Sequence, residues 1–165
     1  MTAKQEVYTP CAVANEFLRL AAEEGRVLTN MQVQKLVFLA HGYHLAILGQ
    51  PLYSHATYAW PFGPVVRTLY EQLRQYGNGE VTAALPTKDQ VAADSVAADI
   101  IAGVWEGYGD RTGSQLSALS HKKGSPWRQT WEKDKFGVIL PDTIAAYYKS
   151  LFEGGADEIR RAAAV

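Results

Sequence analysis

Apolar residues recur at helical spacing near the start of the chain. Val13, Phe17 and Ala21 fall on one face of residues 10–24, and acidic residues lie on the other face. Thr9 supplies an N-cap, and the proline that follows suits the first position of a helix. The pattern therefore predicts an amphipathic helix over residues 10–24.

A second helical stretch, residues 31–48, is apolar on nearly every side, as expected of a helix that other elements surround. Thr29 and Gln32 have the spacing of a capping box at its start, and Gly49 lies at its end. The sequence therefore predicts that this helix is the central one. The residues expected to be most buried in it are Leu36, Val37, Ala40 and Tyr43.

The pattern changes over residues 51–60, where aromatic and β-branched residues favour a small hairpin or an extended arm. The sequence Pro-Phe-Gly-Pro at residues 61–64 predicts a rigid turn. Pro64 is then expected to take the first position of a third helix, which stops at the glycines of residues 77–79.

Four further helices and one extended segment are predicted in the second half of the chain. They are a helix that starts at a capping box over residues 87–90 and ends near Gly107, a helix over 113–120, a helix that starts at Ser125-Pro126, an extended segment at 137–140, and a last helix marked by Ile144, Tyr147, Tyr148 and Leu151. The predicted fold class is mainly α: a compact single-domain bundle of five to seven helices with a small β-hairpin or short extended segments. Residues 1–153 are expected to form the domain, and residues 154–165 a C-terminal tail.

Composition and charge narrow the function classes. The 165 residues are 47% hydrophobic and 20% charged, which is typical of a globular domain. The net charge of −1 argues against a dedicated nucleic-acid binder, because such proteins gain affinity from many lysine and arginine contacts to phosphates. Residues 80–110 carry a local charge of −5, whereas residues 121–135 carry +3 with two interleaved tryptophans. The basic segment is either a solvated helical face or an electrostatic contact for a protein partner.

The sequence predicts no membrane contact. No apolar run follows Lys4 as it would in a signal peptide, and the longest apolar stretch, residues 33–48, is interrupted by polar residues and too short to span a bilayer. The single cysteine, Cys11, cannot form an internal disulfide. These features lead us to expect a cytoplasmic protein.

No motif predicts a catalytic, cofactor or metal site. His41 and His44 are three residues apart, but no HExxH motif or nearby acid completes a metal site, so hydrogen bonding at a helix-packing face is favoured. Cys11 has no local histidine to activate it and is expected to be structural. The serines between residues 114 and 120, with His121, form no GxSxG motif, so capping and turn roles are favoured for them.

Two proline-containing turns carry aromatic residues, one at residues 60–64 and one at residues 125–127. Proline restricts the backbone, so an adjoining aromatic ring loses little entropy on binding. Tryptophan and tyrosine are also frequent energetic anchors of interfaces. The alternative is that these rings simply fill the core.

Several motifs together resemble the Panacea domain family, which includes SocA-like antitoxins and phage-associated GepA-like proteins. The resemblance covers roughly residues 10–152. The motifs that carry it are QKLV at 34–37, AWPFGPVV at 59–66, LSALSH at 116–121 and SPW at 125–127.

The resemblance implies a mainly helical domain that acts as the antitoxin of a bacterial two-gene toxin–antitoxin pair, with a cognate protein toxin as its partner. Members of the family are associated with unrelated toxins, and the family is not defined by a catalytic centre, so we expect no enzymatic activity. The expected mechanism is neutralisation by direct protein–protein binding. The candidate partner-binding residues are Trp60, Phe62, Pro64, His121, Lys122, Lys123 and Trp127.

Three alternatives remain at this point. In the first, the protein is an adaptor that delivers the toxin to a AAA+ protease, and the small apolar end of residues 160–165 is a weak signal for this role. In the second, it is a nucleic-acid-binding regulator of its own operon, which a steep salt dependence of binding would support. In the third, it is a small enzyme that uses one of its four histidines, His41, His44, His55 and His121.

Overall fold

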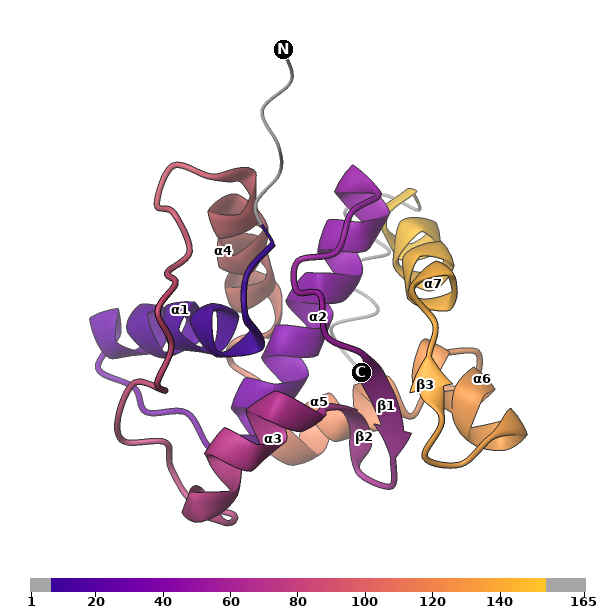
Figure 1. Cartoon of the computed structure of the whole chain (residues 1–165), viewed down its shortest axis with the longest axis horizontal. Coiled ribbons are helices and arrows are strands. Elements are labelled where there is room, and N and C mark those ends of the chain that lie inside the picture. The colour runs from indigo at the N-terminus through magenta and orange to yellow at the C-terminus, as the bar shows by residue number, and fades with distance from the viewer. Residues whose placement is uncertain (1–6, 154–165) are drawn as a thin grey trace.

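The computed structural model describes residues 7–153, and this part of the chain folds into seven α-helices, one 3-10 helix and a small sheet (Figure 1). In chain order the elements are α1 (Pro10–Glu23), α2 (Asn30–Leu48), β1 (Thr57–Trp60), β2 (Gly63–Val66), α3 (Arg67–Leu73), η1 (Arg74–Tyr76), α4 (Val96–Tyr108), α5 (Gly113–Ser120), α6 (Pro126–Lys133), β3 (Val138–Ile139) and α7 (Pro141–Glu153). The mainly α fold class with a small β element is confirmed. The predicted tail, residues 154–165, lies outside the described residues.

Helix α2 is the central element, and α1, α4, α5 and α7 all pack against it. Its capping box is formed: the Thr29 side chain accepts from the backbone N–H of Gln32, whose side chain accepts from the backbone N–H of Thr29. Gly49 ends the helix in the left-handed conformation, with φ of 69°. The four residues predicted to be buried in it are buried, so the prediction of a central helix is confirmed.

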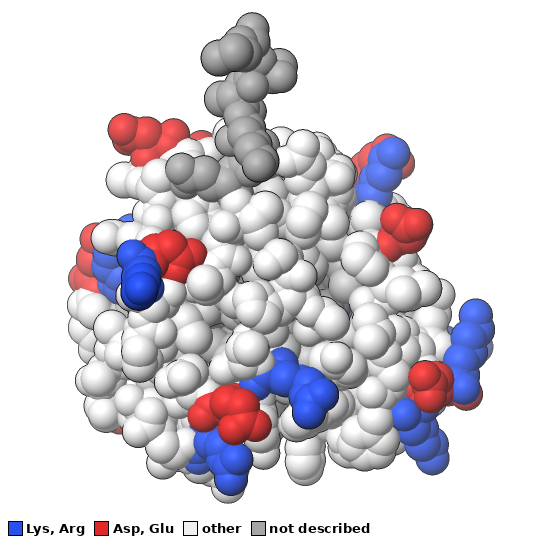
Figure 2. Space-filling view, viewed as in Figure 1, with Lys and Arg blue, Asp and Glu red and all other residues white. Residues whose placement is uncertain are grey.

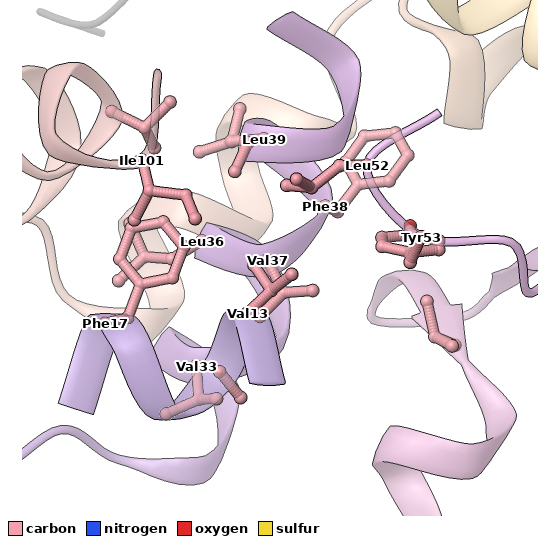
Figure 3. Close-up of a cluster of buried hydrophobic side chains, with 14 of the residues drawn as sticks. Val13, Phe17, Val33, Leu36, Val37, Phe38, Leu39, Leu52, Tyr53 and Ile101 are labelled. Atoms are coloured by element: carbon pink, nitrogen blue, oxygen red, sulfur yellow. The ribbon is translucent and has the colours of Figure 1, made fainter. Parts of the chain in front are cut away.

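The core lies between α2, α1 and α4 (Figure 3). Phe17 from α1, Leu36 from α2 and Ile101 from α4 are fully buried and lie beside one another there. The predicted bounds of the first helix are confirmed within one residue, since α1 starts at its Thr9 N-cap. The part of the chain that the model describes holds no helix long and apolar enough to cross a membrane.

The small sheet has the strand order β2-β1-β3, and both pairs are antiparallel. The predicted hairpin is confirmed, but the prediction that Pro64 starts a helix is wrong. Pro64 is a strand residue opposite Ala59, and α3 starts only at Arg67. A proline is tolerated there because β2 is an edge strand, where one missing N–H breaks no ladder hydrogen bond.

The predicted capping box at residues 87–90 is also wrong, since α4 starts at Val96 with Ser95 as its N-cap. Thr87 instead donates to the Asp89 carboxylate. That carboxylate accepts from both the backbone N–H and the hydroxyl of Thr9, at 2.8 Å and 2.7 Å. The segment therefore serves the start of α1 rather than a helix of its own.

Candidate functional site

The turn between β1 and β2 is held by side chains that donate to its backbone carbonyl oxygens. We call residues 60–64 the hairpin tip. Four side chains donate to it, and we call them the carbonyl clamp. Trp127 Nε1 donates to the Trp60 carbonyl oxygen at 2.6 Å, and His121 Nε2 donates to the Pro61 carbonyl oxygen at 2.9 Å. Ser117 Oγ donates to the Phe62 carbonyl oxygen at 2.9 Å, and Lys35 Nζ donates to the Pro64 carbonyl oxygen at 3.2 Å. The clamp comes from three helices, so the path of the tip is fixed from several sides.

Local sequence explains how α5 and α6 present these donors. Ser117 and His121 are four residues apart and so lie on the same side of α5. Ser125 caps α6 and also donates to the Ser120 carbonyl oxygen at 2.7 Å. Arg128 donates twice to the His121 carbonyl oxygen, at 3.0 Å and 2.8 Å. These hydrogen bonds fix the connection between the two helices independently of the tip.

Gly63 is where the tip comes closest to its supports. Its φ is +119°, which side-chain-bearing residues rarely adopt. A Cβ atom placed on Gly63 would lie 2.7 Å from Ser120 Oγ and 2.9 Å from Lys35 Cε. Glycine is therefore required by both backbone conformation and space.

Within the tip, side chains differ sharply in exposure. Phe62 is 69% exposed, the highest fraction among the large exposed hydrophobic residues of the described chain. Trp60 is partly buried against Tyr70, with ring centroids 5.0 Å apart. Pro64 is buried. The tip therefore offers the Phe62 ring to solvent beside exposed Pro61, while Gly63 and Pro64 are buried.

The structure brings together five of the seven sequence-predicted partner residues: Trp60, Phe62, Pro64, His121 and Trp127 belong to the tip or the clamp. Trp127 is only 3% exposed, so here its ring packs inside and its N–H supports the tip. Lys122 and Lys123 follow the clamp residue His121 directly, Lys122 partly buried and Lys123 exposed.

Sequence reasoning about partner contacts missed two clamp residues, Lys35 and Ser117. Both lie in motifs of the family resemblance, and the spacing of Ser117 and His121 was a usable signal for a shared face of α5. It also missed an exposed apolar row beside the tip, formed by Phe136, Val138 and Leu140 at alternate positions. Phe136 has a φ of +66°, which is strained for a bulky residue, and its ring lies 5.5 Å from that of Trp131.

A cleft of about 680 Å³ lies along one side of the hairpin tip. Its lining comes from the N-terminal ends of α2 and α5, from the hairpin and from α3 with η1. Lys35 lies at this cleft and is 3% exposed. Burial lowers the pKa of Lys35 to about 7, because the charged ammonium loses its hydration there.

The two histidines considered for a metal site, His41 and His44, have structural partners. His41 stacks on Tyr53 with ring centroids 3.7 Å apart, and its Nδ1 accepts from the backbone N–H of Leu52 at 3.2 Å. Burial lowers the pKa of His41 to about 3. His44 is hydrogen-bonded to the Gln50 carbonyl oxygen at 2.6 Å. The predicted hydrogen bonding of this pair is confirmed, but the partners lie in the segment that follows α2 rather than on a packed helix.

Among residues 7–153, no group of three His, Cys, Asp or Glu side chains is placed to hold a metal ion. Cys11 is buried, and burial raises the pKa of its thiol, which disfavours the reactive thiolate. Figure 2 shows basic and acidic side chains interspersed around the rim of one face rather than gathered by sign. The hairpin tip, with an exposed aromatic ring on a hydrogen-bonded turn, is the candidate site taken forward.

Two comparisons with known proteins point to the same family. The family model described as "Antitoxin SocA-like, Panacea domain" matches residues 33–128, a range that contains the tip and all four clamp residues. The protein "Antitoxin SocA" of Caulobacter vibrioides is 33% identical over 130 residues, which cover 70% of this chain and 66% of that protein. The chain thus spans about two thirds of the length of this relative. No solved structure matches the chain.

Proposed function

Because the chain belongs to the SocA-like antitoxin family with a Panacea domain, we propose that it neutralises a cognate protein toxin by binding to it directly. The binding surface in this proposal is the hairpin tip with the residues around it. The toxin's active or target-binding surface would be covered, so neutralisation needs no catalytic group in the antitoxin.

The single observation that carries the proposal is the exposure of Phe62 on a fixed turn. A phenylalanine that is 69% exposed gains little from folding, so its apolar surface remains available to a partner. The carbonyl clamp holds the turn in one conformation, which reduces the entropy lost when a partner binds. Exposed ring and fixed backbone together are the properties of an interface anchor.

The seven predicted residues divide into two groups in this proposal. Phe62, Lys122 and Lys123 contact the toxin, since two of them are exposed and the third lies beside them. Trp60, Pro64, His121 and Trp127 position the tip, since they are buried, partly buried or hydrogen-bonded to it. The exposed row of Phe136, Val138 and Leu140 extends the surface along β3.

The test uses the product of the gene next to the antitoxin gene, expressed alone and together with the antitoxin in cells. Wild-type antitoxin is expected to restore growth and to bind the purified product. Phe62→Ala is expected to weaken binding by about 2 kcal/mol or more and to lose rescue, because an anchor ring is removed. Thermal unfolding is expected to stay nearly unchanged, because the ring packs little in the free protein.

Phe152→Ala is the matched control, since it removes another exposed phenylalanine, 47% exposed, from the end of α7. It is expected to keep both folding and rescue. Full rescue by Phe62→Ala would show that the interface lies elsewhere on the chain. Failure of the wild-type protein to bind or rescue would overturn direct neutralisation of this product.

A further inference from the structure

The cleft beside the hairpin tip has the charge of a site for an anion and the walls of a site for a peptide. We propose that it binds an acidic segment of the toxin, one that carries aspartate or glutamate side chains. This inference rests on the proposed direct binding and adds the chemistry that the partner must bring.

The lining combines aromatic, apolar and polar residues. Trp60, Phe62 and Tyr70 contribute aromatic rings, and α2 contributes Met31 and Gln34. The volume of about 680 Å³ is in the usual range of ligand sites, roughly 300–1,000 Å³. Such a cleft suits a short stretch of chain whose apolar parts pack on the rings.

The charge of the lining has one sign. Lys35 and Arg74 line the cleft, and among the described lining residues there is no aspartate or glutamate. The N-terminal ends of α2 and α5 also lie at the cleft, and each carries a partial positive charge from the helix dipole. Arg74 is paired with Glu71 at 3.3 Å, but both side chains are more than half exposed, so this pair is weak. A carboxylate in the cleft would meet only favourable charge from the residues that line it.

Two buried polar groups at the cleft have unused hydrogen-bonding capacity. Lys35 Nζ has three N–H donors, and within the described residues it donates to one acceptor, the Pro64 carbonyl oxygen. Gln34 Oε1 is buried and has no hydrogen-bond partner among them. A nearby carboxylate would favour the charged form of Lys35, which burial alone disfavours.

Two basic side chains are too few for a nucleic-acid site, where affinity grows with the number of neutralised phosphates. An acidic protein segment needs only one or two carboxylates at the right place. The charge and the aromatic walls therefore favour a protein segment over a polynucleotide.

The experiment changes the charge of the cleft at Ser114, an exposed lining residue in the first turn of α5. Ser114→Glu is expected to weaken binding of the neighbouring gene product about fivefold or more at about 0.1 M salt, and Ser114→Lys to strengthen it. Both effects are expected to shrink at about 1 M salt, because screening shortens the reach of charges. A carboxylate in the first turn of a helix favours folding, so thermal stability of Ser114→Glu should not fall.

Ser150→Glu is the matched control, since it makes the same substitution at an exposed position of another helix, α7, that does not line the cleft. It is expected to leave binding within twofold of wild type. Unchanged binding in both Ser114 variants, with Phe62→Ala still defective, would overturn the cleft proposal and leave the proposed function standing. Stronger binding of Ser114→Glu than of Ser114→Lys would show a basic occupant and also overturn it. Absence of binding by the wild-type protein would instead overturn the proposed function itself.

Discussion

Phe17 and Phe62 are the same residue type in two regions that the chain builds in opposite ways. Phe17 is fully buried between α1, α2 and α4, where its ring contributes to stability (Figure 3). Phe62 is 69% exposed, and what holds its turn in place is the carbonyl clamp on the main chain. In the helical core the apolar side chains face inward. At the tip the backbone carbonyl oxygens accept hydrogen bonds from the protein interior, and the Phe62 ring faces solvent. This difference separates the residues that fold the protein from those that are free to recognise a partner.

The largest expected effect tests the core side of this contrast. Phe17→Ala is expected to lower the free energy of unfolding by about 3–5 kcal/mol, because a large buried ring leaves a cavity. Phe62→Ala, measured in the same urea titration, is expected to cost less than about 0.5 kcal/mol. A similar cost for both variants would abolish the distinction between the two regions.

Acid is expected to weaken the core through His41. The folded pKa is about 3 and the ordinary value about 6.5, so the unfolded chain binds more protons between these values. Stability contributed by neutral His41 is therefore complete above about pH 6.5 and is lost as the pH falls toward 3, by about 3 kcal/mol at pH 4 and about 5 kcal/mol in full.

The control for this loss of stability in acid is His41→Asn, whose side-chain oxygen can still accept from the Leu52 N–H. Urea unfolding from pH 7 to 4 should show a shallower fall for this variant than for wild type. Equal slopes for the two proteins would mean that another group carries the acid sensitivity.

At the tip, Ser117→Ala removes one of the four clamp donors and leaves the Phe62 carbonyl oxygen without it. The expected cost is about 1 kcal/mol in stability, with toxin binding weakened about threefold because the turn is less preorganised. Ser150→Ala, on the exposed side of α7, should change neither. Loss of stability without any loss of affinity would show that the clamp serves folding alone.

The smallest expected effect concerns Lys122 and Lys123, which lie beside the clamp. Reversal of both charges to glutamate should slow association with the toxin about threefold at low salt and leave dissociation nearly unchanged, since charge steers the encounter. Lys88→Glu, in a loop away from the tip, is the control. Equal association rates for the double variant and wild type would exclude steering by this segment.

The sequence predicted the elements whose signals are local. The capping box at Thr29, the N-caps at Thr9 and Ser125 and the bounds of the helix at residues 113–120 all depend on neighbours within four residues, and all are confirmed. At Pro64 the competing structure is local, since pairing with Ala59 in the hairpin overrides the helix-start signal of proline. The error at Thr87 arose because a distant partner overrides a local signal, since its hydroxyl is hydrogen-bonded to that of Thr9 at the start of α1.

The clamp was beyond local reasoning for the same reason. His121 and Ser117 lie 60 and 55 residues from the carbonyl groups that they bind, and no spacing rule connects them. Sequence could mark Phe62 as a candidate from its place between two prolines, but exposure follows from the whole fold. Lys35 in turn lies in a largely apolar helix, and only the structure explains its burial under the tip.

The carbonyl clamp also bears on how such a protein can change partners over evolutionary time. Every residue has a carbonyl oxygen, so the clamp donors keep the same acceptors whatever side chains stand at positions 61 and 62. Substitutions there can alter the shape and chemistry offered to a partner without redesign of the domain that supports them. A single substitution at position 61 or 62 can therefore change which partner is bound. It largely avoids the loss of stability that a substitution in the packed core would cause.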